Sequence, residues 1–343
     1  MISYIETVLK NICDVPGVGG QPQIADAVIS FLREYTDKIQ KDAVGNVIAT
    51  FPANKENAPT VLLEAHMDEI GFVVTSIDEK GFLKVAPCGG VDSRCLSATP
   101  VIVWADTALD GVFCAAVPHL QKGAKSDKAL SAEELFVDVG LSADVAKTRI
   151  PIGTRVSFRS IFSKLQNTCV TSNALDNRAG VAAVLGSLHL LKGKELPCTV
   201  RVLFSVGEEL GCRGAVSGTF ESDADFAIVT DVSFAYTPYE KRTSCGEMGK
   251  GAMLGIAPTL SYGMTKVLLD IAKRKNIPHQ NEVMGGKTGT DADVIGTIRA
   301  GIPTALLSIP LKYMHTPVEV VDINDIAAVS GWMAAYVEEG DWL

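Results

Sequence analysis

The sequence has 343 residues, of which 47% are hydrophobic and 21% charged, and its formal net charge is −9. Wholesale disorder is excluded, and the apolar fraction suffices for one large domain or two of ordinary size. Because the chain is acidic, lacks a long Lys/Arg run and has no apolar stretch of about 18 residues, we expect neither a nucleic-acid partner nor a membrane span.

The N-terminal segment, residues 1–13, carries charges inside an apolar pattern and predicts a helix, not a secretion signal. The eight Cys residues form no C-x-x-C pair, which argues against a thiolate zinc site. Without a secretion signal, we expect reduced thiols and a cytoplasmic location. A helix over residues 22–35 and strands over residues 46–51 and 60–65 follow along the chain.

The middle of the chain, residues 71–162, has a different pattern. Short alternating segments predict strands at residues 71–77, 82–86, 101–104, 111–117, 135–139 and 154–158. The clearest helix start in this stretch is a capping-box form at residues 131–134. We expect residues 71–162 to form a small, mostly β domain inserted into the rest of the chain.

From residue 172 onward, helix and strand alternate again. The periodicity predicts helices at residues 179–191, 261–275, 291–300 and 323–338, and strands at residues 200–206, 227–230 and 304–309. This alternation is typical of an α/β fold with a mainly parallel sheet between helix layers. Residues 1–70 and 163–343 are therefore predicted to form one α/β domain.

Metal-capable residues follow several of the predicted strands. His66, Glu209, Asp231 and His315 each come at or shortly after a strand end, and Asp176 precedes the helix at residue 179. In open α/β sheets, ligands bind outside the carboxyl ends of the strands, so these five residues can meet at one edge. Each alone could be a core histidine, a loop residue or a helix cap. Burying five ionisable groups together is costly without a partner, and a bound cation would be such a partner.

Two imidazoles and three carboxylates suit zinc, cobalt or manganese better than copper or an iron–sulfur cluster. Five side chains are too many for one catalytic zinc, which has three protein ligands and an open position. They suit two metal ions that share one carboxylate, an arrangement common in hydrolases.

Neighbouring acids have predicted roles of their own. Asp68 lies two residues after His66, so both project to one side of an extended strand, and Asp68 can accept the second imidazole N–H. Glu208 and Glu209 are adjacent and point to opposite sides. One of them can bind metal while the other serves as general base toward a water molecule.

Four segments carry a resemblance to a known family, namely residues 65–71 (AHMDEIG), 174–178 (ALDNR), 207–214 (GEELGCRG) and 313–319 (YMHTPVE). They resemble the tetrahedral-shell aminopeptidases, also called glutamyl or deblocking aminopeptidases or cellulase M. The likeness extends to residues 118–120 (PHL) and 289–292 (GTDA). It implies a zinc-peptidase α/β domain with an inserted barrel or PDZ-like domain.

The resemblance also implies residue roles. One metal would take His66 and Asp231, the other Glu209 and His315, and Asp176 would bridge them. Glu208 would be the general base, and Asp68 would orient His66. The family removes N-terminal residues from peptides with zinc or cobalt bound, and it assembles from dimers into shells of twelve subunits.

The sequence departs from the family pattern in two places. Thr288-Gly289 replaces the frequent Gly-Gly before Thr-Asp-Ala, and residues 232–247, expected to border the substrate pocket, are divergent. The alternatives are an amidohydrolase or deacylase with the same two-metal chemistry, and a non-catalytic metal-binding scaffold. A glycosidase is disfavoured because adjacent Glu208 and Glu209 cannot flank a sugar.

Overall fold

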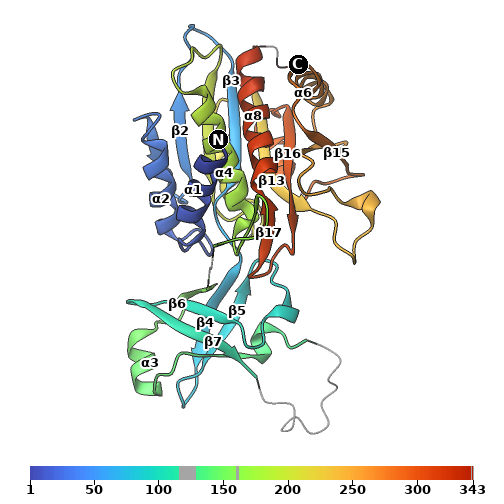
Figure 1. The fold of residues 1–343 in the computed structure, drawn as a ribbon. Coiled ribbons are helices and arrows are strands. Elements are labelled where there is room, and N and C mark those ends of the chain that lie inside the picture. The colour runs from blue at the N-terminus through green and yellow to red at the C-terminus, as the bar shows by residue number, and fades with distance from the viewer. Residues whose placement is uncertain (116–128, 160–161, 341, 343) are drawn as a thin grey trace.

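The computed structural model describes residues 1–115, 129–159, 162–340 and 342. Two bodies are visible in Figure 1: a larger α/β body built from both ends of the chain, and a smaller β body built from its middle. The segment 118–120 that contributes to the family resemblance lies outside the described residues. In the described part of the chain, no helix is long and apolar enough to span a membrane.

The larger body contains an 11-stranded sheet. Its centre is four parallel strands in the order β12 (Thr199–Ser205), β3 (Thr60–His66), β13 (Phe226–Phe234) and β16 (Thr304–Lys312). The flanking strands are mostly antiparallel: β1 (Ile39–Lys41), β2 (Val47–Phe51), β17 (Glu319–Asp322), β11 (Cys169–Ser172) and β10 (Ser163–Lys164), with β14 (Ala252–Ile256) antiparallel to β16 and β15 (His279–Val283) parallel to β14. The α/β prediction is confirmed, with the parallel strands in the centre.

Helices cover both faces of this sheet. One face carries the main core, formed with α1 (Ile2–Cys13), α2 (Pro22–Leu32), α4 (Leu175–Leu191), α6 (Tyr262–Lys275) and α8 (Ile323–Glu339). Figure 1 shows α4 and α8 side by side across the centre of the sheet, where they pack on each other. The opposite face carries a smaller core with α5 (Arg213–Phe220) and α7 (Ala292–Ile295). Apolar side chains on both faces explain why the central strands are continuously hydrophobic.

The smaller body is a closed barrel in the order β4-β5-β8-β7-β6-β9. Its strands are β4 (Gly71–Ile77), β5 (Leu83–Cys88), β6 (Pro100–Trp104), β7 (Ala108–Cys114), β8 (Phe136–Asp138) and β9 (Arg155–Phe158), and α3 (Ala143–Arg149) lies before β9. Phe72 packs edge-on against Phe113 and Phe158 in its core. The mostly β prediction is confirmed as a barrel. The predicted domain boundaries stay a prediction.

One predicted helix is wrong in length. The periodicity of residues 291–300 predicts ten residues of helix, but α7 covers only Ala292–Ile295. After Ile295 the backbone continues in turns with bonds from Thr297 N–H to the Val294 carbonyl and from Ile298 N–H to the Ile295 carbonyl, and Arg299 and Gly301 then adopt positive φ angles of 56° and 94°. This turn brings the chain into β16 and leaves Asp291 at the start of α7, facing the sheet.

Candidate metal centre

The parallel strands place the candidate residues at one edge. His66 is the last residue of β3 and pairs in register with Ser205, the last residue of β12. Asp231 lies within β13, which continues to Phe234, four residues beyond the predicted strand end at 230. Because β12, β3 and β13 run in the same direction, their carboxyl ends bring His66, Asp231 and the segment around Glu208 together.

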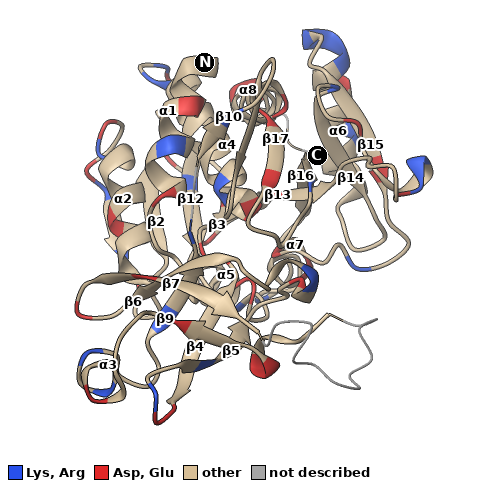
Figure 2. Ribbon diagram, turned by 60° about the horizontal axis from the view of Figure 1, so that its bottom comes forward, with Lys and Arg blue, Asp and Glu red and all other residues tan. Residues whose placement is uncertain are grey.

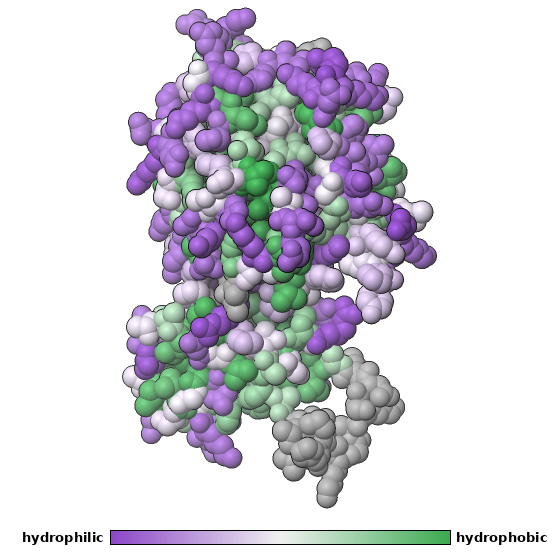
Figure 3. All heavy atoms as spheres, in the orientation of Figure 1, coloured by the Kyte–Doolittle hydropathy of each residue, from purple (hydrophilic) through white to green (hydrophobic). Residues whose placement is uncertain are grey.

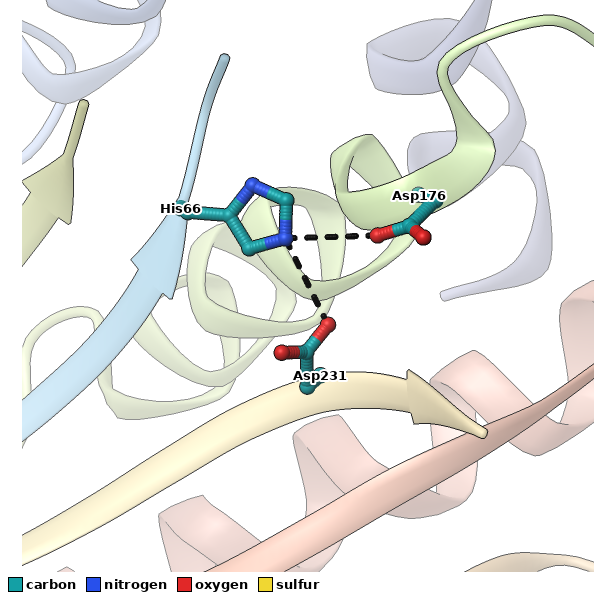
Figure 4. Close-up of side chains that lie close together, drawn as sticks. All are labelled: His66, Asp176 and Asp231. Carbon is teal, nitrogen blue, oxygen red and sulfur yellow. Dashed lines mark ion pairs between the residues drawn. The ribbon is translucent and has the colours of Figure 1, made fainter. Parts of the chain in front are cut away.

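The five predicted ligands fall into two groups that share Asp176. His66 Nε2 lies 3.2 Å from Asp176 Oδ1 and 3.5 Å from Asp231 Oδ1, as Figure 4 shows. His315 Nε2 lies 3.4 Å from Asp176 Oδ2 and 3.3 Å from Glu209 Oε1. Each group has its donor atoms within 4.8 Å of one another. Asp176 therefore turns one carboxylate oxygen toward each histidine.

The backbone around Asp176 is specialised for this orientation. Ala174 has a positive φ of 60°, and the Asp176–Asn177 peptide bond is cis. Asp176 and Asn177 both depart from helical angles at the start of α4. The Asn177 side chain donates to the Thr230 carbonyl at 2.8 Å and accepts from the Gly180 N–H at 2.9 Å. These bonds tie the first turn of α4 to β13, next to Asp231.

Glu319 connects the backbones of two candidate ligands, Asp176 and His315. Its carboxylate accepts the backbone N–H of Asp176 at 3.0 Å and that of His315 at 2.9 Å. Glu319 is 1% exposed, and burial raises its pKa well above the ordinary value. One side chain from β17 thus fixes the relative position of two candidate ligands that are 139 positions apart, 176 and 315, in the sequence.

The centre has more carboxylates than its two imidazoles can balance. Burial raises the pKa of Asp231 to about 6 and also raises that of Glu209. Burial would lower the pKa of His315, but facing Asp176 and Glu209 raise it to about 11. His66 is likewise opposed by burial, yet Asp231, Asp176 and Asp68 raise its pKa well above the ordinary value. Crowded, desolvated carboxylates that face two imidazoles are the donor set that divalent cations satisfy.

Asp68 and Glu208 adjoin the two groups. Asp68 is fully buried, its Oδ1 lies 3.6 Å from His66 Nδ1, and it accepts the Glu208 N–H at 3.2 Å. The separation from His66 exceeds hydrogen-bond length, although Asp68 lies on the predicted side of the ring. Glu208 is not a member of either group, and burial raises its pKa to about 8. Its side chain instead lies near Cys212 and Asp291.

Two glycines of the barrel, Gly89 and Gly90, lie directly against the candidate ligands. A Cβ atom added at Gly89 would lie 2.9 Å from Glu209 Oε2, and one added at Gly90 would lie 2.9 Å from His315 Nδ1. A larger residue at either position would crowd a candidate ligand. The larger body and the barrel therefore meet at the candidate metal centre.

Residues 45–331 match the family model described as M42 glutamyl aminopeptidase. A lysyl aminopeptidase of Pyrococcus furiosus is 34% identical over 97% of this chain and 96% of the relative.

This chain belongs to the M42 aminopeptidase family.

Solved structures of related enzymes have the same fold. An aminopeptidase from the archaeon Desulfurococcus kamchatkensis superposes with a TM-score of 0.92 at 31% identity, covering 99% of this chain and 96% of that one. A TET1 peptidase of Pyrococcus horikoshii, which can assemble into a tetrahedron or a large octahedral shell, superposes with a TM-score of 0.86 at 29% identity over 98% and 99% of the two chains. The M42 chain is therefore a hydrolase of the aminopeptidase class, and its family implies divalent metal ions.

Several residues of this M42 site have no predicted role. Ser205 Oγ lies within hydrogen-bond distance of both Glu64, at 2.7 Å, and Asp291, at 2.8 Å, and the two acids are buried. Glu64 lies in an apolar strand, two residues before His66. A charged residue at such a position is visible in the sequence and could have marked Glu64 as part of the site. The role of Glu319 has no such signal, because it depends on contacts of β17 with α4.

Proposed function

We propose that this M42 aminopeptidase binds two divalent metal ions. One ion takes His66 and Asp231, the other takes Glu209 and His315, and Asp176 bridges them. This assignment rests mainly on Asp176, because its two carboxylate oxygens lie 3.2 Å and 3.4 Å from two different histidines, His66 and His315. Mixed imidazole and carboxylate donors favour zinc, with cobalt and manganese as alternatives.

When bound, the two ions would polarise the scissile carbonyl and the attacking water. Glu208 is the proposed general base, because it stands beside both groups without belonging to either. It accepts a proton from the water and delivers it to the leaving amine. Asp68 faces His66 from the Nδ1 side at 3.6 Å, beyond hydrogen-bond length, and its proposed role is to orient the ring by charge so that Nε2 faces the acids.

The substrate is a peptide with a free N-terminus. The site is lined by carboxyl groups, and Glu208 lies outside both groups of candidate ligands, so an acceptor is present for a free α-amine that an acylated amine could not use as well. The names of the similar proteins do not indicate which N-terminal residue this enzyme prefers to remove. The family description refers to a glutamyl enzyme and the Pyrococcus furiosus relative is a lysyl enzyme, which are preferences of opposite charge.

A homo-oligomer built from dimers, with twelve subunits as the expected shell, is the proposed assembly. The TET1 peptidase that shares this fold assembles into shells. In this chain the barrel exposes Val112, Val145 and Ile152, with 38%, 42% and 63% of their surface accessible. Figure 3 shows apolar side chains gathered on this part of the molecule. Exposed apolar patches of this kind are typical of subunit contacts.

The remaining proposals concern nucleic-acid partners and the cellular location. Figure 2 shows acidic and basic residues interspersed along the ribbon, and the net charge is −9, so we propose no nucleic-acid partner. All eight cysteines are free thiols, consistent with the reducing cytoplasm as the location.

The test is hydrolysis of aminoacyl-p-nitroanilides, each with and without an N-acetyl group, after chelation and after return of zinc, cobalt or manganese. We expect metal-restored activity on the free-amine substrates alone. Activity on the acetylated set would instead indicate a deacylase or amidohydrolase. Stoichiometric metal binding without turnover of any substrate would favour a scaffold.

A further inference from the structure

Glu282 contacts β13, the strand that carries Asp231, without belonging to either group of candidate ligands. It projects from β15, and its two carboxylate oxygens accept hydrogen bonds from different strands. Ser308 Oγ of β16 donates to Oε2 at 2.7 Å, and Ser233 Oγ of β13 donates to Oε1. The two hydroxyls fix the direction of the carboxylate.

The strand register places Glu282 on the same side of the sheet as the metal ligand Asp231. Ser233 lies two residues beyond Asp231 on β13, so both side chains project from one face. Ser308 is the register partner of Asp231 on β16 and projects from that face as well. With a rise of about 3.3 Å per residue, Ser233 lies about 6.6 Å further along the strand than Asp231.

The charge of Glu282 is not balanced locally. Within residues 1–115, 129–159 and 162–340, it forms no ion pair with Lys, Arg or His, and its contacts are the two neutral hydroxyls. It is partly exposed, whereas Ser308 beneath it is 1% exposed. A carboxylate offers about four acceptor positions, so two hydroxyl donors leave capacity for a further donor.

We propose that Glu282 binds the side chain of a basic N-terminal residue, so that the enzyme removes Lys and Arg in preference to apolar or acidic residues. The inference rests on the proposed function, because it assumes that the substrate α-amine and scissile carbonyl lie at the metal centre. A lysine ammonium stands about 6 Å from its Cα, given carbon–carbon bonds of about 1.5 Å. That reach matches the displacement from Asp231 to Ser233, whose hydroxyl holds the Glu282 carboxylate.

The same geometry disfavours acidic residues. A Glu or Asp side chain directed along this face would bring a second carboxylate toward Glu282, with no described cation to separate them. Like charges at such short range repel strongly in a partly desolvated site. An apolar side chain would bury Glu282 without offering it a donor.

The experiment measures kcat/KM for Lys-, Arg-, Leu- and Glu-p-nitroanilide with the metal-loaded wild type, Glu282→Gln and Asp270→Asn. Asp270 is an exposed acid on α6, so its variant makes the same change in charge on another element. We expect the wild type and Asp270→Asn to prefer Lys and Arg over Leu by about tenfold or more. Glu282→Gln should lose most of that preference through a lower kcat/KM for Lys and Arg, and a circular dichroism spectrum and urea midpoint equal to those of the wild type would show that the protein is folded.

Two outcomes overturn the inference while leaving the proposed function intact. One is metal-dependent hydrolysis with an acidic or apolar preference in the wild type. The other is an unchanged Lys/Leu ratio in Glu282→Gln, which would mean that Glu282 only ties β15 to β13 and β16. If no substrate is turned over, the proposed function fails, and calorimetric binding of the free amino acids decides the inference separately. Tighter binding of lysine than of leucine, lost in Glu282→Gln, supports it, and equal binding refutes it.

Discussion

Asn46 connects the start of the chain to the segment that carries Glu208 and Glu209. It is fully buried, and its side-chain oxygen accepts the Val206 N–H at 2.9 Å. Its amide donates to the Gly214 carbonyl at 2.8 Å and to the Asp42 carboxylate at 2.7 Å. The Asn46→Ala substitution removes all three bonds.

The loss in free energy of unfolding depends on which hydrogen bonds the partners of Asn46 retain. The Gly214 carbonyl retains a bond from Ser217 Oγ at 3.1 Å, whereas the Val206 N–H loses the side-chain acceptor that it has at the end of β12. Leaving a buried N–H unpaired costs about 1–3 kcal/mol, and the lost bond to the Asp42 carboxylate adds about 1 kcal/mol. We therefore expect Asn46→Ala to lower the free energy of unfolding by about 3 kcal/mol.

Activity should fall as well, because Val206 directly precedes Gly207, Glu208 and Glu209. A displacement of about 1 Å in catalytic groups can cost about 100-fold in rate, and we expect a loss of at least about tenfold in kcat/KM. Urea denaturation at matched protein concentration and p-nitroanilide assays measure the two effects. Ser217→Ala is the control, since it removes the 3.1 Å contact from the same amide and the 3.1 Å bond to the Gly214 carbonyl but leaves the Val206 N–H paired, and it should cost about 1 kcal/mol. Equal urea midpoints for the two variants would refute the reasoning.

Two further predictions concern a catalytic acid and a buried acid. Glu208→Gln should lower kcat by about 100-fold to 10,000-fold while metal content stays at the wild-type level, and full turnover with metal bound would remove Glu208 as the base. Burial raises the pKa of Asp325 to about 6 despite N–H donors from Gly249 and Gly251, each at 2.7 Å. A raised carboxyl pKa means that the folded state prefers the neutral acid, so its stability contribution is complete below about pH 4 and is lost as the pH rises through about 6. The stability of the wild type relative to Asp325→Asn should therefore decrease between pH 4 and 7 in urea titrations, and a flat or rising difference would contradict the assignment.

Much of the architecture was predictable from local pattern. Apolar strands with polar residues at their carboxyl ends identify a parallel α/β sheet and its ligand-binding edge, because parallel strands present those ends together. His66, Glu209 and Asp231 become candidates by that rule alone, and Asp68 by its two-residue offset from His66. Their proximity in the structure agrees with the pattern, while their roles as ligands stay a proposal.

Helix length was less predictable. The apolar period of residues 291–300 predicts a longer helix than the structure has, since α7 ends after one turn at Ile295 and the chain continues in tighter turns. Among the antiparallel flanking strands, β2 agrees with the strand predicted at residues 46–51, but the pairing of these strands was not predicted, since it depends on distant segments. β17, for example, pairs with β11 and β16, whose sequences carry no local sign of that partner.

The sequence by itself determined which residue types are available for metal chemistry and which edge of the sheet they occupy, since both follow from strand periodicity. Only the tertiary structure decided how they are oriented. Glu319 joins Asp176 to His315 through backbone N–H groups, and Gly89 and Gly90 of the barrel close against the ligands. The position of Glu282 beside Ser233 and Ser308 likewise depends on three strands meeting. These contacts join segments far apart in the chain, and local residue patterns do not specify such long-range distances.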